Sequence, residues 1–279
     1  MLKARVVTAL LLRAGFLAML FLLPFSGWLL FSCVVAGIGA WEWGGLMKLG
    51  IPGRRGYAFV SMALCATLGW SVFDIGTGAI RQAILLSAIF VLTAVFWLIA
   101  IPLWLRAKWP TSARVPGLLT GLIVLVPACL ALMQLRASAP LFLLAAMASV
   151  WVADISAYVC GRAFGRHKLA PAISPGKTWE GAAGAVAGVL IYGVTAAWAS
   201  GRMPNTAGAW LLFSMALIIL TAVSILGDLF ESLAKRQAGV KDSGTILPGH
   251  GGALDRIDSL TSTLPLVGLA MLFWEGRLS

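Results

Sequence analysis

Residues 82–101 read QAILLSAIFVLTAVFWLIAI, a run of twenty residues without a charged side chain. A helix that crosses the hydrocarbon layer of a membrane needs about 20 mostly apolar residues, since each residue adds about 1.5 Å along the helix axis. This run therefore predicts a transmembrane helix. Similar apolar blocks precede and follow it along the chain.

The composition of the whole chain agrees with this prediction. Its 279 residues are 60% apolar and 11% charged, with a mean hydropathy of +0.95. An ordinary soluble domain is about half apolar and about a quarter charged. These values exclude a soluble enzyme, a disordered chain, a disulfide scaffold and a small β-barrel. The four cysteines stand singly and are interpreted as small apolar packing residues. An all-α polytopic membrane protein remains.

Nine segments are apolar enough to be spans, and turn-forming residues mark the breaks between them. For example, Pro24 separates the first two spans, and residues 52–56 (PGRRG) follow the second. We expect two regions, an N-terminal set of helices over 1–135 and a second region over 136–279. The predicted spans are 6–23, 27–47, 57–73, 82–101, 116–134, 139–161, 181–199, 208–229 and 260–274.

The charges predict how the chain is oriented in the membrane. The chain has 21 Lys and Arg against 10 Asp and Glu, and they lie between the apolar blocks. This placement favours contact with a bilayer and with anionic substrates, and not with nucleic acid. With the N-terminus in the cytoplasm, sixteen basic residues fall on the cytoplasmic side and four on the other. The positive-inside rule thus predicts a C-terminus on the opposite side and cytoplasmic polar segments at 162–180 and 230–259.

Seven of the ten acidic residues lie between positions 154 and 258. Near the end of the eighth span, polar side chains follow the helical spacing i, i+3, i+4 and i+7, which places them on one face. Carboxylate oxygens suit Mg²⁺, cationic side chains neutralise phosphate, and glycines around His250 let backbone N–H groups approach an anion. The pattern therefore predicts a metal–polyphosphate site. The residues on the helix face are Asp228, Glu231, Ser232 and Lys235, and Asp255 and Asp258 share a second face.

Residues 174–181 (SPGKTWEG) form a second polar segment. They lack the GxxxxGK[ST] spacing of a P-loop and follow a span instead of a strand, so a P-loop is rejected. A Ser/Lys/Thr turn that opens a helix can still hold a phosphate on its N-terminal amides. Glu180 falls in the first turn of that helix, where a carboxylate suits the helix dipole.

Simpler interpretations stay open for several of these residues. The basic side chains could be topology charges at the inner face, Asp258 could cap a helix or pair with a nearby arginine, and His250 could bond at the headgroup level. Asp154 and Tyr158, one helical turn apart, could form a buried hydrogen-bonded pair. Glu42, between two tryptophans, is interpreted as an anchor at the membrane interface, and the other Trp and Phe as lipid-facing or interfacial.

From Ser232 to Asp258 the chain follows the pattern S-x-x-K-R-x4-K-D-x-G-x3-P-x-H-G-G-x-x-D-R-x-D, with every polar position filled. This stretch resembles the signature of the phosphatidate cytidylyltransferase family, the CDP-diacylglycerol synthases. The resemblance extends to residues 174–181, to Asp154 with Tyr158 and to residues 40–43 (AWEW). It therefore covers nearly the whole chain.

The resemblance implies transfer of a cytidylyl group from CTP to phosphatidic acid, which yields CDP-diacylglycerol and pyrophosphate. It also implies Mg²⁺ as cofactor, with two metal ions. The lipid phosphate is largely ionised at neutral pH, so no strong general base is required. The implied partners are CTP, phosphatidic acid and the bilayer, with a homodimer left open. The implied location is the cytoplasmic membrane of a bacterium, with the active site facing the cytoplasm.

The resemblance also implies roles for individual side chains, all in the second region or its loops. Metal ligands are expected at Asp228 and Asp255, with Asp258, Asp154 and Glu180 as further candidates. Expected catalytic residues are Asp228, Asp255, Lys235, Arg236, Lys241, His250 and Arg256. Substrate binding is expected from Ser174, Lys177, Thr178, Ser232, Gly251 and Gly252.

Two other classes of function are compatible with the sequence. A transporter of anionic solutes would suit many spans and a basic vestibule, but its charges would be expected near the membrane midplane instead of at inner helix ends. A CTP-dependent lipid kinase would use a similar site but would release CDP instead of pyrophosphate. Analysis of the products therefore separates the two enzymes.

Overall fold

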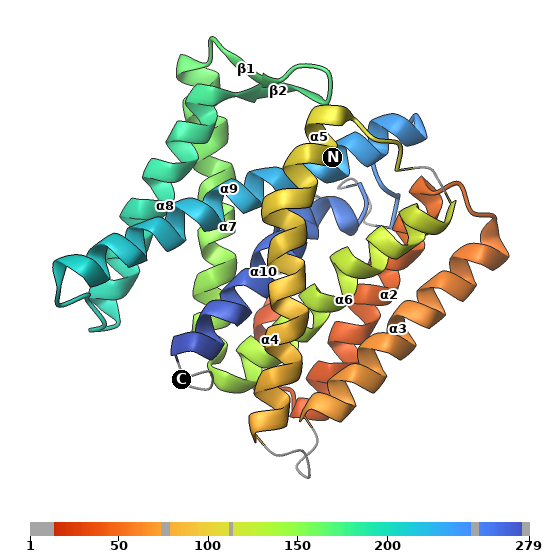
Figure 1. Ribbon diagram of the computed structural model, residues 1–279, viewed down its shortest axis with the longest axis horizontal. Coiled ribbons are helices and arrows are strands. Elements are labelled where there is room, and N and C mark those ends of the chain that lie inside the picture. Colours follow the sequence, from red (N-terminus) through yellow and green to blue (C-terminus); the bar gives the residue numbers. More distant parts are fainter. Residues whose placement is uncertain (1–13, 74–78, 112–113, 247–250, 275–279) are drawn as a thin grey trace.

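The computed structural model describes residues 14–73, 79–111, 114–246 and 251–274. Within these ranges eight helices are long and apolar enough to cross a membrane, which agrees with a polytopic helical membrane protein (Figure 1). The elements are α2 (Phe25–Leu46), α3 (Ile51–Phe73), α4 (Ala79–Val95), α5 (Ile101–Ala107), α6 (Arg114–Ser138), α7 (Pro140–Phe164), β1 (Lys168–Ala170), β2 (Ser174–Thr178), α8 (Trp179–Ala199), α9 (Ala207–Ala238) and α10 (Leu254–Trp274).

Eight of the nine predicted spans coincide with these helices. The other one, 6–23, begins outside the described residues, although residues 14–22 are helical. The predicted break at 52–56 is wrong, because α3 already begins at Ile51. Pro52 stands in the first turn of α3, where a helix does not use the backbone N–H that proline lacks. Proline here starts a helix instead of interrupting one.

The predicted polar segment 230–259 is also more helical than expected. α9 continues to Ala238 and α10 begins at Leu254, so helices occupy both ends of this segment. Hydropathy identifies only the apolar part of a helix, whereas the hydrogen-bond ladder propagates into polar sequence once a helix has started. The charged end of α9 is therefore held on a rigid element.

One span contains a local irregularity. α4 passes through a π-helical turn at Phe96–Ala100 into α5, and together they form a span at Arg81–Ala107. Pro102 lies at the start of α5. Since proline cannot donate the hydrogen bond of a regular helix, a wider turn before it is expected.

Large aromatic side chains fill the centre of the bundle. Trp28, Trp43 and Trp97 are fully buried, which contradicts the expectation that Trp and Phe face lipid or the interface. Trp28 donates its indole N–H to the carbonyl of Leu132 (3.1 Å), and Trp43 donates to that of Gly117 (2.9 Å). Tryptophan is readily buried where its N–H finds such a partner, as in these two residues, whereas the described residues supply none for the N–H of Trp97.

The cysteines have the packing role that the sequence predicts. Cys33, Cys65 and Cys129 are buried as free thiols within the main apolar cluster, whereas Cys160 is half-buried. A buried free cysteine behaves as a small apolar residue.

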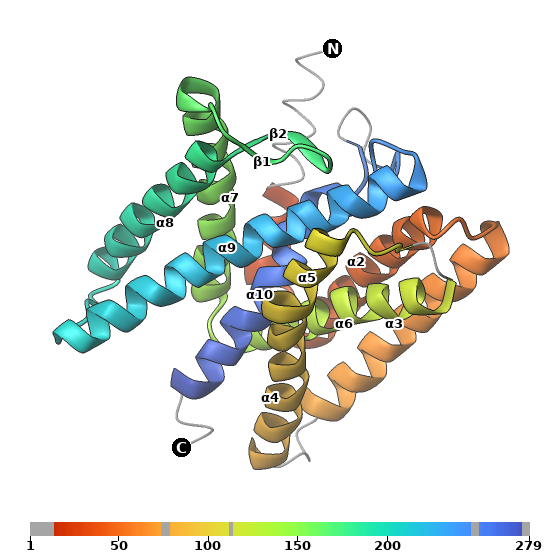
Figure 2. The same ribbon diagram turned by 45° about the horizontal axis from the view of Figure 1, so that its top comes forward.

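The predicted all-α fold needs one addition, a short antiparallel hairpin between α7 and α8. In it β1 pairs with β2, with Lys168 opposite Thr178 and Ala170 opposite Ser174. In both views the hairpin and the C-terminal part of α9 lie at the same end of the bundle (Figures 1 and 2). The two polar segments therefore share one side, as predicted.

α9 and α10 cross closely at Gly227. A Cβ atom on this glycine would lie 2.5 Å from Oγ of Ser262 and 2.9 Å from the carbonyl oxygen of Asp258. At the same crossing, Ser259 Oγ donates to the Ser224 carbonyl (3.1 Å) and Ser262 Oγ donates to the Val223 carbonyl (2.9 Å). This contact fixes how the charged parts of the two helices face each other.

We predict that Gly227→Ala lowers the free energy of unfolding by about 1–3 kcal/mol, because the added methyl group overpacks the helix crossing. Gly208→Ala in the same helix is the matched control, since a Cβ atom at Gly208 would have nothing within 4 Å. Unfolding in mixed micelles, followed by circular dichroism, measures both variants. Equal stability of the two variants would contradict the close crossing.

Candidate functional site

The polar face of α9 forms as the spacing predicts. Ser232 Oγ donates to Oδ1 of Asp228 (3.3 Å), and Lys235 Nζ donates to Oε2 of Glu231 (2.5 Å). In each pair the two residues are one helical turn apart, so all four side chains lie along the same side of the helix. Phe230, in the same part of α9, belongs to the apolar core and is fully buried. α9 therefore packs with one side and presents its polar groups with another.

The hairpin contributes a cation to this face. Lys177 on β2 extends to Asp228, with Nζ 2.7 Å from Oδ2, and the two side chains are 23% and 35% exposed. Arg236, near the end of α9, donates to the carbonyl of Ile173 in the hairpin turn at 3.5 Å. The predicted substrate-binding Lys177 and the predicted metal ligand Asp228 are thus brought into direct contact.

Lys235 is held between two carboxylates from different helices. Its Nζ lies 2.5 Å from Glu231 Oε2 on α9 and 2.6 Å from Asp255 Oδ1 on α10. The three side chains are only 13%, 4% and 12% exposed. Removal of such charges from water is costly unless they are paired, so these contacts set the relative positions of α9 and α10.

Asp255 also holds the segment that precedes α10. Its Oδ2 accepts hydrogen bonds from the backbone N–H of Gly252 (2.8 Å) and of Ser243 (3.0 Å). A carboxylate in the first turn of a helix also suits the helix dipole. Asp255 therefore links Lys235 to both described ends of the loop between α9 and α10.

Two further carboxylates lie near this network. Asp154 on α7 interacts electrostatically with Asp228 and Lys177, and Asp258 on α10 with Asp228, Lys235 and Lys177. Asp258 Oδ1 also accepts from the backbone N–H of Ser259 (2.7 Å). Carboxylates in this group outnumber ammonium groups, which favours a bound cation. The group, called here the acidic cluster, consists of Asp154, Asp228, Glu231, Asp255 and Asp258 with Lys177 and Lys235.

The buried pair of Asp154 and Tyr158 is a wrong interpretation. Tyr158 is 64% exposed, and its hydroxyl oxygen accepts a hydrogen bond from Arg162 Nη1 at 3.0 Å. Arg162 lies one turn further along α7, so it offers the tyrosine a charged partner on the same face. Asp154 instead interacts electrostatically with Asp228 of α9 and Lys177 of the hairpin.

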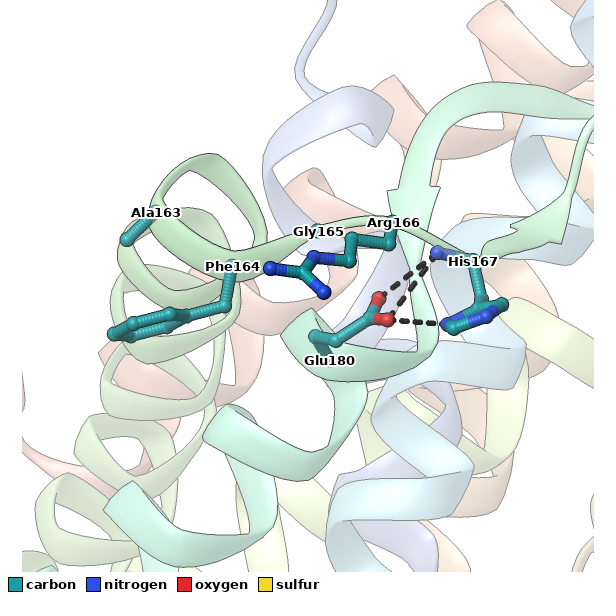
Figure 3. Close-up of a pocket in the computed structure, with 6 residues that line it drawn as sticks. All are labelled: Ala163, Phe164, Gly165, Arg166, His167 and Glu180. Atoms are coloured by element: carbon teal, nitrogen blue, oxygen red, sulfur yellow. Dashed lines mark hydrogen bonds and ion pairs between the residues drawn. The ribbon is translucent and has the colours of Figure 1, made fainter.

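Glu180 lies apart from the acidic cluster, in a pocket of about 440 Å³ at the end of α7 (Figure 3). Its Oε1 lies 2.6 Å from Nδ1 of His167, and both of its oxygens accept from the backbone N–H of His167 at 3.2 Å. The structure thus pairs this predicted metal ligand with a histidine that sequence analysis missed, and the chain around His167 offers no motif to signal it. The pocket is lined by Ala163, Phe164, Gly165, Arg166, His167 and Glu180.

The remaining predicted residues have simpler surroundings. Thr178 is buried and caps α8, because its Oγ1 accepts from the backbone N–H of Gly181 at 3.1 Å. A helix thus opens here as predicted, but residues 174–178 form strand β2 instead of the expected turn. Ser174 is half-buried at the start of β2, whereas Lys241 and Arg256 are exposed. Gly251 adopts a left-handed backbone with φ of 82°. His250 lies outside the described residues.

In the described part of the chain, no three His, Cys, Asp or Glu side chains are arranged to hold a metal ion by themselves. Mg²⁺ commonly takes one or two carboxylates and completes its shell with water and phosphate oxygens. The acidic cluster meets that smaller demand through Asp228 and its carboxylate neighbours. Glu231 adds a buried oxygen, Oε1, for which the described residues supply no hydrogen-bond partner.

The interpretation of Glu42 as an interface anchor is also wrong. Glu42 is fully buried, and its carboxylate accepts hydrogen bonds from Ser243, Ala253 and Leu254. It thus reaches the loop before α10 from α2, far away in the sequence. A carboxylate inside an apolar span is a signal that could have marked it, because such groups usually face a partner within the protein.

Comparison with known proteins gives a consistent result over the full length. The model of the cytidylyltransferase family matches residues 3–274. The chain is 40% identical to a phosphatidate cytidylyltransferase of Pseudomonas aeruginosa, covering 98% of this chain and 97% of the relative. It is 34% identical to a phosphatidate cytidylyltransferase of Haemophilus influenzae, and the match covers 98% of this chain and 99% of the relative. A Synechocystis protein of the same name is 49% identical over 44% of this chain and 40% of its own.

We predict that Lys235→Met lowers the free energy of unfolding by about 3–5 kcal/mol, because Glu231 and Asp255 would lose their shared cation in a buried position. Lys168→Met removes an exposed lysine from β1 and is expected to change stability by less than about 0.5 kcal/mol. Chemical unfolding in micelles measures both. If Lys235→Met were as stable as Lys168→Met, the two contacts would not matter for folding.

Proposed function

Because this chain belongs to the cytidylyltransferase family and is therefore a nucleotidyltransferase, we propose that it transfers the cytidylyl group of CTP to phosphatidic acid. The products are CDP-diacylglycerol, which stays in the bilayer, and pyrophosphate, which leaves to water. The observation that carries the proposal is the match over almost the whole chain to relatives that bear this name. The acidic cluster, built on membrane helices, provides a place for the reaction.

In the proposed reaction an oxygen of the lipid phosphate forms a bond to the α-phosphorus of CTP. The bond from that phosphorus to the oxygen bridging to the β-phosphate breaks, and its electron pair leaves with pyrophosphate. A phosphate monoester is largely ionised at neutral pH, so the attacking oxygen has no proton that must be removed. The main barrier is electrostatic, since two anions must approach and charge develops on the leaving group.

The cationic side chains are proposed to lower this barrier. Lys177 and Lys235 lie within the acidic cluster, and each already bonds to a carboxylate oxygen. A phosphate oxygen can replace a carboxylate oxygen as the partner of an ammonium group with little change in charge. Arg236, Lys241 and Arg256 are exposed and are proposed to bind the phosphates that extend into water.

Mg²⁺ is proposed as the cofactor, and its role here is to neutralise phosphate oxygens. Asp228, with Asp154 and Asp258 beside it, provides the oxygen donors that this ion prefers. Asp255 is a further candidate, although it already accepts three hydrogen bonds in the structure. Those contacts give Asp255 a second task, to hold Lys235 and the loop before α10.

The proposal is tested by incubating the purified protein with α-labelled CTP, phosphatidic acid and Mg²⁺. Label in the lipid fraction together with pyrophosphate supports it. Release of CDP would instead indicate a lipid kinase, and no transfer at all would remove the proposed activity. Solute flux in reconstituted vesicles without nucleotide would favour a transporter.

We predict that Lys177→Met lowers kcat/KM by about 10²-fold, the usual loss when one group that stabilises developing charge is removed. Lys168→Met is the matched control, because it removes a lysine of the same hairpin whose side chain is exposed. Initial rates of lipid labelling at several CTP concentrations measure the effect. A Lys177→Met enzyme as active as the control would place Lys177 outside the site.

We further propose that the hairpin faces the cytoplasm, in the inner membrane of a bacterial cell. The test starts from a variant in which the four native cysteines are replaced, and it introduces one new cysteine at a time. Arg202 lies in the exposed connection between α8 and α9, and Arg202→Cys should react with an impermeant maleimide on intact cells. Lys168→Cys should react only after the cells are opened, because the positive-inside rule places the hairpin inside. The reverse pattern would invert the orientation.

A further inference from the structure

We infer that Glu42 is a positioning residue for the proposed reaction, because it holds both described ends of the loop between α9 and α10 against the acidic cluster. The inference rests on the proposed function. Glu42 comes from α2, a helix of the N-terminal region, whereas every residue expected to carry chemistry lies after position 150. Its carboxylate is fully buried and bonded to the loop, so it would act through other residues.

The carboxylate of Glu42 accepts three hydrogen bonds from the two described ends of the loop and the start of α10. Oε1 accepts from the backbone N–H of Ala253 (3.0 Å), and Oε2 accepts from the backbone N–H of Leu254 (2.7 Å) and from Oγ of Ser243 (3.0 Å). Glu42 itself is fully buried. Ala253 and Leu254 stand at the start of α10, so this carboxylate caps that helix from a distant part of the chain and complements its dipole.

The loop backbone is shaped around this carboxylate. A Cβ atom on Gly244 would overlap with Oε1 of Glu42. A Cβ atom on Gly252 would lie only 2.6 Å from Oε2 of Glu42. Any residue other than glycine would displace the carboxylate or the loop at either position. Two glycines of the signature stretch therefore have a physical reason that concerns Glu42.

Glu42 and Asp255 both hold the same piece of chain. Ser243 donates its hydroxyl to Glu42 and its backbone N–H to Asp255. Asp255 is in turn bonded to Lys235. Displacement of Ser243 and of the first residues of α10 would therefore shift Asp255 and Lys235, and a shift of about 1 Å in a reacting group can cost about 10²-fold in rate.

α2 is well suited to hold such a group in place. Trp43, the next residue, is buried, stacks on Phe230 of α9 with ring centroids 6.0 Å apart, and donates its indole N–H to Gly117. The helix turn that carries Glu42 is thus fixed to α9 and α6. A carboxylate placed on a rigid element can define the position of a loop, whereas a mobile one cannot.

The chemistry of the contact predicts a graded series of variants. In Glu42→Gln one oxygen becomes an NH₂ group, which is a donor facing donors, so at least one loop hydrogen bond is lost. In Glu42→Asp both oxygens remain acceptors but are withdrawn by one methylene group. Glu42→Asp should therefore retain part of the function that Glu42→Gln loses.

Two measurements test the inference in the detergent-solubilised full chain. Hydrogen exchange of the backbone amides at 253 and 254, followed by mass spectrometry without substrate, reports whether the loop is held. For Glu42→Gln we expect exchange there to be at least about tenfold faster, and kcat to fall by about 10²-fold with KM for CTP changed much less. Glu42→Asp should lie between Glu42→Gln and the wild type.

The matched control is Gln134→Leu. Gln134 is a buried polar residue of α6 whose Nε2 donates to the carbonyl of Gly268, toward the other end of α10, at 3.2 Å. This variant also removes a buried hydrogen bond to α10, but it leaves the loop contacts in place. It should change neither the exchange at 253 and 254 nor kcat.

A double variant with Ser243→Ala tests whether the two residues act together. If Glu42 acts through Ser243, Ser243→Ala should lower kcat on its own but add little to Glu42→Gln. Independent roles would make the two losses multiply and would contradict this route. If Glu42→Gln does not fold, the same measurements of amide exchange and kcat are made on Glu42→Asp, Ser243→Ala and their double variant.

Normal kcat in Glu42→Gln despite faster exchange would overturn the inference and leave Glu42 a purely structural residue. Unchanged exchange would overturn it as well, since the loop would then be held without Glu42. A wild-type chain without cytidylyl transfer would remove the proposed function, while the exchange comparison would still decide whether Glu42 holds the loop.

Discussion

Lys235 lies between Glu231 of α9 and Asp255 of α10, and these three nearly buried charges impose the strictest constraint on the site. Charge removed from water inside a membrane protein costs several kcal/mol for each ion unless a partner and further hydrogen bonds compensate it. The neighbouring features supply that compensation. Asp255 gains two backbone N–H groups, and the close crossing at Gly227 brings α10 near enough to α9 for the pairing.

The spans could be predicted from the sequence because membrane insertion depends mainly on local composition. A run such as 82–101 is too apolar and too long for any other environment, whatever the rest of the chain does. The ends of helices were less predictable, since they depend on whether a polar or proline-containing segment can continue a helix. Pro52 lies in the first turn of a helix and the charged end of α9 continues one, and hydropathy distinguishes neither.

The candidate site could be predicted where it rests on spacing along one element and not where it rests on contacts between elements. The face that joins Asp228 to Ser232 follows from the helical repeat alone. The contact of Lys177 with Asp228 requires knowledge of how the hairpin lies over α9, which no local pattern provides. For the same reason the sequence does not separate Glu180 from the other carboxylates, although Glu180 faces His167 in a pocket apart from them.

Contacts between distant segments also determine how the two regions of the chain relate. The expected boundary near residue 135 separates an apolar part from a part rich in charge, but packing crosses this boundary, since α10 lies against α2, α4 and α6. Adjacent residues of α2 show why both parts are needed. Trp43 stacks on Phe230 within the apolar core, while Glu42 beside it caps α10 and meets the loop. A rigid apolar core thus fixes one carboxylate, that carboxylate fixes the start of α10, and α10 presents Asp255 to Lys235. The N-terminal helices therefore belong to the structural support of the charged site as well as to its anchorage in the membrane.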